Sequence, residues 1–336
     1  MAELRVGIIG CGGIGTEHAD RITNKLSGAK VTGCTDLFPA SAERVAQLTG
    51  CKIYDSGAAL IQSDEVDAVI IATIGSTHKE YVLEAIKAGK PVFCEKPLTE
   101  TAADSREVVD AEVAGGKKLV QVGFMRRYDE SYIKLKEMID SGMLGAPLLI
   151  RCAHRNPEVG TSYITPMAIT DTAIHEIDCL HWLIDDDYES VQTFFGRKSK
   201  YSHENLMDPQ LVLMRTKKGV LIELEIHVNC QYGYDIRCEV VGEEGTAALP
   251  NPMDLDMRLG AKQYNNILTD WKDRFRKAYD TEIQDWINDT QKGEVNGPTA
   301  WDGYVASVTA DACVKSQTSG KEEPIETGDR PSFYDA

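Results

Sequence analysis

The sequence predicts an α/β protein of two domains, with a doubly wound parallel sheet over residues 1–122 and an α+β domain over residues 123–336. Short apolar runs alternate with helix-like segments in the first domain, which is typical of a parallel sheet with helices on both faces. Strand-like runs dominate residues 147–241 and alternate in polarity, so we expect a large, mainly antiparallel sheet with one face covered. The length of 336 residues suits two domains of about 150 residues each.

The composition disfavours several classes of protein. Hydrophobic residues make up 42% of the chain, enough for substantial cores, and no apolar run approaches the roughly 20 residues of a membrane span. The 53 acidic and 36 basic residues give a net charge of −17, so we expect neither nucleic-acid nor membrane binding. Residues 1–9 lack the basic start of a signal peptide, and the nine scattered cysteines show no Cys-x-x-Cys spacing. We therefore expect a cytoplasmic protein with buried thiols.

A glycine-rich motif follows the first predicted strand, residues 4–9, and precedes a helix-like run over residues 16–26. It reads Gly10-Cys11-Gly12-Gly13-Ile14-Gly15, which fits G-x-G-x-x-G. In a dinucleotide site Gly10 permits the tight turn, Gly12 the close approach of a pyrophosphate, and Gly15 the contact between helix and strand. The alternative is a glycine turn that binds nothing.

An acid ends the second predicted strand, residues 30–35, about 20 residues after the glycine motif. There Asp36 can accept hydrogen bonds from the hydroxyls of an adenosine ribose. Its charge opposes a 2′-phosphate, and the next residues, Leu37 and Phe38, supply no arginine to compensate. The sequence therefore predicts NAD rather than NADP. The alternative is a chance acid after a strand.

Two further strand ends carry candidate residues. Lys96 directly follows the predicted strand over residues 91–95, at the edge of an open α/β sheet where ligands bind. Pro97 restricts the backbone of its neighbour, so this lysine is held in one conformation. The alternative is a solvated lysine that closes a strand. His78 follows the strand over residues 67–73, and we expect it to be structural or to touch the cofactor.

The remaining elements are helices and strands of ordinary length. Helices are predicted over residues 77–88, 101–114, 129–140, 271–290 and 299–317, and strands over residues 118–122, 147–154, 190–197, 210–216, 220–228 and 235–241. In the strand over 220–228, aliphatic residues alternate with polar ones such as Glu223 and Glu225. The polar face of this sheet is expected to meet solvent or another subunit.

A helix over residues 171–183 carries the second set of candidates. Its apolar stripe consists of Ile174, Ile177, Leu180 and Leu183. Asp171 is a good helix start, and Asp171, His175 and Asp178 fall at i, i+4 and i+7, where a carboxylate can orient the imidazole. Cys179 stands where a zinc-protease motif would need its second histidine, so we expect no metal. The other alternative is an exposed face that happens to contain a histidine.

These parts together are what an alcohol dehydrogenase needs. Oxidation removes a hydride from carbon and a proton from the hydroxyl on that carbon. Histidine is suited to take that proton near neutral pH, and lysine to stabilise the developing alkoxide. A non-catalytic dinucleotide sensor is the alternative from another class, although it would not need Lys96, Asp171 and His175 together.

At these residues the chain resembles the glucose–fructose oxidoreductase, inositol dehydrogenase and MocA family, and within it the bacterial NAD-dependent myo-inositol 2-dehydrogenases. The motifs that carry the resemblance are Gly10-Cys11-Gly12-Gly13-Ile14-Gly15, Glu95-Lys96-Pro97, Val122-Gly123-Phe124-Met125-Arg126-Arg127-Tyr128-Asp129, Asp171-Thr172-Ala173-Ile174-His175-Glu176-Ile177-Asp178 and Gln231-Tyr232-Gly233-Tyr234-Asp235. The first two mark the family broadly, and the later ones are more particular to the inositol enzymes.

The resemblance implies a Rossmann domain, an α/β domain with an open-faced sheet, and a homotetramer assembled through those faces. It implies that Lys96, Asp171 and His175 are catalytic and contact the substrate, with His175 taking the proton from the C2 hydroxyl of myo-inositol. The product would be 2-keto-myo-inositol (scyllo-inosose). The other substrate contacts implied are Arg126, His154, Asn156, Asp178 and Tyr234. The cofactor contacts expected are Gly10, Gly12, Gly13, Ile14, Gly15, Asp36, Thr73, His78, Glu95 and Lys96.

Two features leave alternatives open. The loop Thr73-Ile74-Gly75-Ser76 lacks the proline common there in the wider family. Stereoisomer preference depends on hydroxyl-binding residues outside the shared motifs. Scyllo-inositol or a pyranose sugar therefore stays an alternative substrate.

Overall fold

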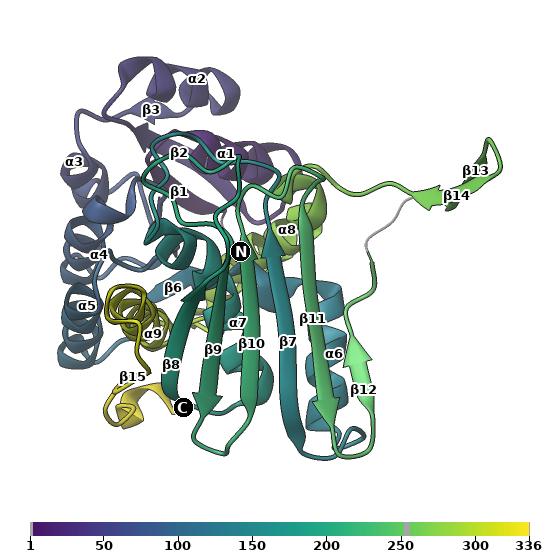
Figure 1. Ribbon diagram of the computed structural model, residues 1–336. Coiled ribbons are helices and arrows are strands. Elements are labelled where there is room, and N and C mark those ends of the chain that lie inside the picture. The colour runs from purple at the N-terminus through teal and green to yellow at the C-terminus, as the bar shows by residue number, and fades with distance from the viewer. Residues whose placement is uncertain (1–2, 252–255, 336) are drawn as a thin grey trace. The chain divides into compact units, whose positions relative to one another are not determined.

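The computed structural model describes residues 3–251 and 256–335. The chain forms two compact units (Figure 1). The first comprises Met1–Phe124, Tyr279–Ser307 and Thr327–Ala336, and the second comprises Met125–Ala278 and Val308–Glu326. The first unit thus begins with nearly the range expected for the nucleotide domain and also takes in two segments from the C-terminal part of the chain.

The first unit is built on a parallel sheet of six strands in the order β3-β2-β1-β4-β5-β6. The strands are β1 (Leu4–Ile9), β2 (Ala29–Thr35), β3 (Lys52–Ile53), β4 (Ala68–Ile71), β5 (Val92–Glu95) and β6 (Val120–Gly123). The strand order reverses between β1 and β4, and ligands of such sheets bind at the reversal, outside the carboxyl ends of the strands. The predicted doubly wound sheet is confirmed.

Helices cover this sheet and leave an apolar core between the layers. They include α1 (Gly13–Asn24), α2 (Pro39–Thr49), α3 (Gly57–Gln62), α4 (His78–Lys87) and α5 (Ala102–Gly115), with the short turns η1 (Gly75–Thr77) and η4 (Ser332–Tyr334). The Thr101 hydroxyl caps α5 by accepting a hydrogen bond from Asp104 N at 3.2 Å. Gly116, with positive φ, ends the helix. Trp286 is buried in the core, with its ring centroid 5.8 Å from that of Phe93.

The second unit is built on a sheet of seven strands in the order β12-β11-β7-β10-β9-β8-β15. The strands are β7 (Pro147–Arg155), β8 (Tyr188–Phe195), β9 (Gln210–Thr216), β10 (Leu221–His227), β11 (Asp235–Gly242), β12 (Thr246–Ala248) and β15 (Glu323–Pro324). Pairing is antiparallel except between β7 and β10, so the predicted mainly antiparallel sheet is confirmed. The alternation predicted for β10 is also confirmed, because Ile222, Leu224 and Ile226 are buried and Glu223 is exposed.

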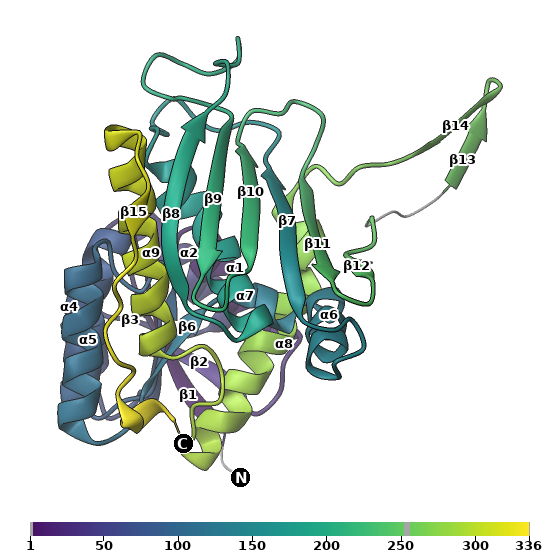
Figure 2. The same cartoon turned by 60° about the horizontal axis from the view of Figure 1, so that its bottom comes forward.

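The helices of the second unit lie on one side of its sheet. Helices α6 (Glu130–Asp140) and α7 (Ile174–Ile184) pack on one face, and no helix of the described part of the unit covers the other (Figure 1, Figure 2). A π-helical turn, η3 (Ala168–Ala173), precedes α7, so Asp171 lies within a turn and is not the helix start that the sequence predicts. Such turns occur frequently at functional sites.

The other elements of the chain are η2 (Met125–Tyr128), the hairpin β13 (Asp256–Leu259) and β14 (Lys262–Asn265), α8 (Trp271–Lys292) and α9 (Ala300–Ser319). Helices α8 and α9 each contribute residues to both units. In the part of the chain that the structure describes, we find no helix with both the length and the apolar character needed to cross a membrane.

Candidate active site

The loop after β1 has the backbone that a dinucleotide site requires. Gly10 has a φ of +95°, and a Cβ there would lie 2.6 Å from the backbone of Ala72. A Cβ on Gly15 would collide with the carbonyl oxygen of Gly10, so glycine lets α1 start close to β1. A Cβ on Gly12 would meet no atom within 4 Å, which leaves that side of the loop open to a ligand. The first turn of α1, from Gly13 onward, presents its N–H groups here.

Asp36 lies directly after β2, with both carboxylate oxygens anchored to the backbone. Its Oδ2 accepts a hydrogen bond from Cys11 N at 2.6 Å, and its Oδ1 accepts one from Phe38 N at 2.8 Å. A pocket of about 580 Å³ lies at this acid, and its lining includes Gly10, Gly12, Asp36, Ser56, Thr73 and Tyr81. A concave site with the anchored carboxylate of Asp36 and an open glycine loop fits the adenosine half of NAD.

A larger hollow of about 890 Å³ lies at the opposite, amino ends of the strands and is lined by residues that include Arg5, Lys30 and Lys52. Its cations are already paired, since Arg5 Nη2 lies 2.6 Å from Asp67 and Lys52 Nζ lies 3.0 Å from Glu65. Ligands of open α/β sheets bind at the carboxyl ends instead. The smaller pocket is therefore the candidate nucleotide site.

The residue before Lys96 is braced from inside the first unit. Lys96 is half-buried after β5, and its peptide bond to Pro97 is cis. His18 Nε2 on α1 lies 2.6 Å from Glu95 Oε1, and Arg21 Nη1 lies 2.9 Å from His18 Nδ1. Because a guanidinium only donates, Nδ1 must accept and Nε2 carries the proton toward Glu95. Burial lowers the pKa of His18, which favours this neutral ring.

The bracing continues to α8, where Asp280 Oδ1 accepts a hydrogen bond from Arg21 Nε at 2.6 Å. The sequence predicts Glu95 as a cofactor contact, and the structure places its carboxylate against His18 inside the unit. There the carboxylate stabilises the end of the strand that carries Lys96.

His78 joins the segments that follow β4 and β5. Its Nδ1 lies 2.7 Å from the carbonyl oxygen of Pro97, and its Nε2 lies 3.1 Å from that of Thr73. The Thr77 hydroxyl donates to Thr73 Oγ1 at 2.8 Å. Burial lowers the pKa of His78. This geometry suits the structural role expected of the histidine, while Thr73 itself lines the nucleotide pocket.

Helix α7 in the second unit is buried on nearly all sides. Its predicted apolar stripe, Ile174, Ile177, Leu180 and Leu183, is confirmed as buried. The polar residues His175, Glu176 and Asp178 are buried too, with exposed fractions of 9%, 1% and 2%. The alternative of an exposed amphipathic face is therefore wrong. Polar groups at this depth need partners or a function, because their burial costs free energy.

Asp171 is half-buried on η3 and lies near the buried phenol of Tyr163. Burial is the main cause that raises the pKa of Tyr163, and the charge of Asp171 adds to it. A π-helical turn holds more residues than an α-helical one, so the face that the sequence predicts from α-helical spacing does not carry over directly to Asp171. Among residues 3–251 and 256–335, no three His, Cys, Asp or Glu side chains are arranged to hold a metal ion.

Glu176 connects two of the predicted substrate contacts. Arg126 Nη1 forms a salt bridge with Glu176 Oε1, and His154 Nδ1 lies 2.9 Å from Oε2. Arg126 Nη2 also lies 3.1 Å from His154 Nδ1. All three side chains are almost completely buried. Because an ionised carboxylate only accepts hydrogen bonds, the contact with Glu176 requires a proton on Nδ1 of His154.

Other candidates of the second unit gather around His154. Its ring centroid lies 6.4 Å from that of His175 and 5.7 Å from that of Tyr234, which is nearly perpendicular to it. Burial raises the pKa of the Tyr234 phenol. Asn156 lies just beyond β7, where its N–H donates to His227 O at 3.0 Å. The structure thus brings His154, His175 and Tyr234 together and places Asn156 at the adjacent strand end.

Asp178, one turn further along α7, is paired with Arg127. Its Oδ2 accepts from Arg127 Nε at 2.9 Å, and its Oδ1 accepts from Nη2 of the same guanidinium. This bidentate pairing holds the carboxylate in one orientation. Each oxygen still has lone-pair capacity for a further donor. The consecutive arginines of η2, Arg126 and Arg127, therefore each meet one acid of α7, Glu176 and Asp178.

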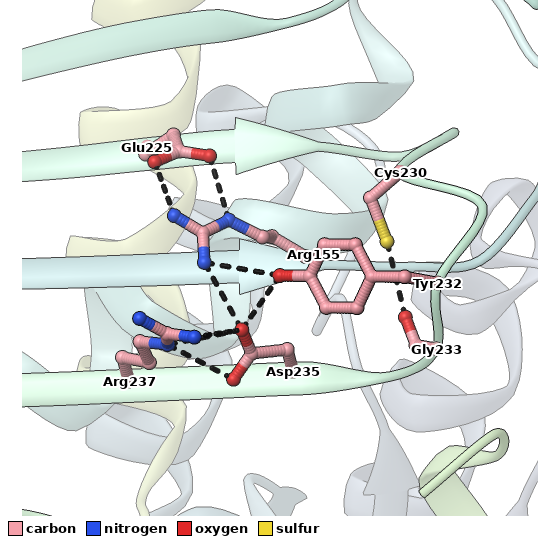
Figure 3. Close-up of polar contacts among 7 residues, drawn as sticks. All are labelled: Arg155, Glu225, Cys230, Tyr232, Gly233, Asp235 and Arg237. Atoms are coloured by element: carbon pink, nitrogen blue, oxygen red, sulfur yellow. Dashed lines mark hydrogen bonds and ion pairs between the residues drawn. The ribbon is translucent and has the colours of Figure 1, made fainter. Parts of the chain in front are cut away.

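A further ionic network lies on the outer face of the sheet, where β7, β10 and β11 run side by side (Figure 3). Arg155 donates to the two oxygens of Glu225 at 2.7 and 2.6 Å, and to Asp235 at 3.0 Å. The Tyr232 hydroxyl donates to the same oxygen of Asp235 at 2.6 Å. Since Arg155 follows His154 in β7, the network holds the strand end that carries this histidine.

Two family models match the chain. The one described as "Oxidoreductase family, NAD-binding Rossmann fold" matches residues 4–124, and the one described as "Oxidoreductase family, C-terminal alpha/beta domain" matches residues 136–327. The chain belongs to the glucose–fructose oxidoreductase, inositol dehydrogenase and MocA family. The family that the sequence motifs predict is confirmed, and so is NAD as the cofactor of the first domain.

Relatives within this oxidoreductase family match along the whole chain. An inositol 2-dehydrogenase from Klebsiella pneumoniae is 54% identical over 336 residues, which cover 99% of this chain and 99% of that protein. The crystal structure of myo-inositol dehydrogenase from Lactobacillus casei in complex with NAD(H) and myo-inositol has a TM-score of 0.97, 43% identity and 99% coverage of both chains. The scyllo-inositol dehydrogenase of Lactobacillus casei has a TM-score of 0.90 at 24% identity and covers 96% of this chain and 99% of that one, which shows the fold alone.

The sequence does not point to His18 or Glu176 as parts of the site. A signal exists for Glu176, because it stands between apolar residues of one helix while Arg126 and Arg127 supply two cations for two acids. No local signal exists for His18, whose partner Glu95 lies 77 residues further along the chain.

Proposed function

We propose that this chain catalyses the NAD-dependent oxidation of myo-inositol at its C2 hydroxyl to 2-keto-myo-inositol (scyllo-inosose). The observation that carries the proposal is the full-length similarity to inositol 2-dehydrogenases, at 54% identity over 99% of the chain. The likeness to an enzyme crystallised with NAD(H) and myo-inositol, at a TM-score of 0.97, supports the same substrate.

The proposed chemistry divides between a hydride and a proton. NAD, when bound, supplies the hydride acceptor at nicotinamide C4. We assign the proton of the C2 hydroxyl to His175, because an imidazole titrates near neutral pH. Asp171 orients that ring and favours its protonated form. The ammonium of Lys96 stabilises the negative charge that develops on the alkoxide oxygen.

The remaining proposed contacts serve binding. The substrate hydroxyls are held by Arg126, His154, Asn156, Asp178 and Tyr234. Glu176 orders two of these side chains and Arg127 orders a third, so their geometry is set before the polyol arrives. The cofactor contacts are Gly10, Gly12, Gly13, Ile14, Gly15, Asp36, Thr73, His78, Glu95 and Lys96, of which Glu95 and His78 act by bracing backbone.

The variants Lys96→Met and His175→Ala test the catalytic assignment. Each is expected to lower kcat about 10²-fold or more and to change NAD affinity little, because both variants leave the adenosine pocket at Asp36 intact. The NADH absorbance gives kcat, and titration with NAD gives the affinity. Lys134→Met, at an exposed lysine of α6, is the matched control. A variant that keeps near wild-type kcat would contradict the role given to that residue.

A substrate panel separates myo-inositol from the alternatives. We expect the highest kcat/KM with myo-inositol among myo-inositol, scyllo-inositol and glucose. A higher kcat/KM with scyllo-inositol or glucose would make that compound the substrate, oxidised by the same reaction. Tight NAD binding without turnover of any of them would support a dinucleotide sensor.

We also propose that the protein is a cytoplasmic homotetramer assembled through the open faces of the seven-stranded sheets. These faces carry side chains such as Arg155 and Glu225 in place of a helical layer. Light scattering on the purified protein should give four times the mass of one chain, and a monomer would contradict the proposal.

A further inference from the structure

Arg44 contacts the same residue of the glycine-rich loop as Asp36. It lies on α2, and its Nη2 donates to the carbonyl oxygen of Cys11 at 2.8 Å and lies 3.5 Å from Thr16 Oγ1. The N–H of the same cysteine donates to Asp36 at 2.6 Å. One residue of the loop is therefore bound at its two ends by a carboxylate and a guanidinium.

Arg44 adds a positive charge at the loop residue that Asp36 also contacts, and this charge bears on the choice between NAD and NADP. The residues that follow Asp36 in sequence, Leu37 and Phe38, are apolar and mostly exposed, so their side chains have no donor or positive charge for a 2′-phosphate. The fold nevertheless brings an arginine to the loop from the second turn of α2. A guanidinium presents five donors in a planar fork that suits phosphate oxygens.

The Asp36 side chain would lose two hydrogen bonds from backbone N–H groups if it rotated away to make room for a phosphate. Both of its oxygens are anchored, one by Cys11 and the other by Phe38. A phosphate on the ribose hydroxyl beside this acid adds a charge of about −1.5 to −2. Asp36 repels that charge, whereas the Arg44 guanidinium, held at the same loop residue, attracts it.

We propose that Asp36 and Arg44 together set the nucleotide preference, with Arg44 as a specificity-determining residue that supplies the residual affinity for adenosine 2′-phosphates. The proposal rests on the ribose-binding role given to Asp36. In the intact site the repulsion by Asp36 prevails and NAD is preferred. When the acid is removed, Arg44 becomes the ligand of the 2′-phosphate.

A purely structural arginine predicts something different. If Arg44 only held the carbonyl oxygen of Cys11 and the hydroxyl of Thr16, its loss would loosen the loop for every dinucleotide alike. NAD and NADP affinities would then fall by the same factor, whereas a phosphate ligand affects NADP selectively.

The test is a double-mutant cycle on the full-length protein, read as equilibrium binding of NAD and NADP without polyol, by calorimetry. The variants are Asp36→Ala, Arg44→Met and the double substitution, with Arg106→Met on the exposed side of α5 as the matched control. We expect Arg44→Met to weaken NADP about tenfold more than NAD. We expect Asp36→Ala to tighten NADP at least tenfold, and the double variant to lose most of that gain. Arg44→Lys should retain part of the attraction as a point charge.

Two results would overturn the proposal. One is an equal loss of NAD and NADP affinity in Arg44→Met, and the other is a double variant that binds NADP as tightly as Asp36→Ala. Because the assay needs no turnover, a wrong polyol assignment leaves it unaffected. Failure of the wild-type protein to bind NAD at all would instead contradict the proposed function.

Discussion

The two units each contain a buried histidine between an arginine and a glutamate, but the two arrangements differ in how the ring is used. In the first unit Arg21 and Glu95 meet opposite nitrogens of His18. In the second unit Arg126 and Glu176 both approach the same nitrogen, Nδ1 of His154. The first network is satisfied by one neutral tautomer. In the second network Nδ1 would have to accept a hydrogen bond from Arg126 and donate one to Glu176. One ring nitrogen cannot do both at once.

This difference shows which group fixes the ring in each network. The ring of His18 has a single consistent proton arrangement, which suits a group that only holds the end of β5. The Nδ1 proton of His154 must point toward Glu176, because the carboxylate accepts hydrogen bonds and the guanidinium of Arg126 does not. Arg126 is therefore held by its own salt bridge with Glu176. Glu176 is therefore the group on which the second network depends. The following substitutions test this comparison.

The largest effect is expected from Glu176→Gln. The change removes the buried anion and leaves the Arg126 guanidinium without its countercharge, so the free energy of unfolding should fall by about 3 kcal/mol. Urea denaturation measures the loss. Glu137→Gln, at an exposed position of α6, is the matched control and should change stability by less than about 0.5 kcal/mol. Equal stabilities of the two variants would mean that the buried pair contributes little.

The next effect is the pH dependence of stability that comes from His18. Burial lowers the pKa of this ring in the folded protein. Below the ordinary histidine pKa of about 6.5, the ring is therefore protonated in the unfolded chain and still neutral in the folded chain. Its contribution to stability is therefore present above that pH and is lost as the pH falls. His18→Gln removes the titration while keeping a donor for Glu95.

Between pH 7 and pH 5 the wild-type unfolding free energy should fall more steeply than that of His18→Gln. The difference in slope is at most about 1.4 kcal/mol per pH unit for one proton. Urea denaturation at several pH values measures both slopes. Parallel slopes would show that His18 does not stay neutral in the folded unit.

The smallest effect is expected on the outer face of the sheet. In the single chain Arg155 pairs with Glu225 and Asp235 in a partly solvated network (Figure 3), so Arg155→Gln should lower the unfolding free energy of the dissociated chain by about 1 kcal/mol or less. Salt screens such pairs, and the difference from wild type should shrink further at 1 M NaCl. The cost of Glu176→Gln should persist there because its pair is buried. A salt-resistant loss in Arg155→Gln would remove the distinction between the two networks.

The sequence by itself determined the features that depend on neighbours along the chain. Glycines at Gly10, Gly12 and Gly15 and the alternation in β10 follow from local backbone geometry and periodicity, and the structure shows both. The family could be identified from the sequence because each of its motifs is a short, contiguous segment of the chain. The cap of α5 is local in the same way, because the Thr101 hydroxyl accepts from the N–H of Asp104, three residues further along the chain.

Only the tertiary structure decided how the buried charges are paired. The π-helical turn at Asp171 reflects packing that α-helical periodicity does not encode. Glu176 looks like any acid on a helix until Arg126, 50 residues earlier, is placed against it. Arg44 reaches the loop of Cys11 across 33 residues of chain. The free energy of an ionised side chain depends on the charges and solvent around it, and those are set by contacts between distant segments.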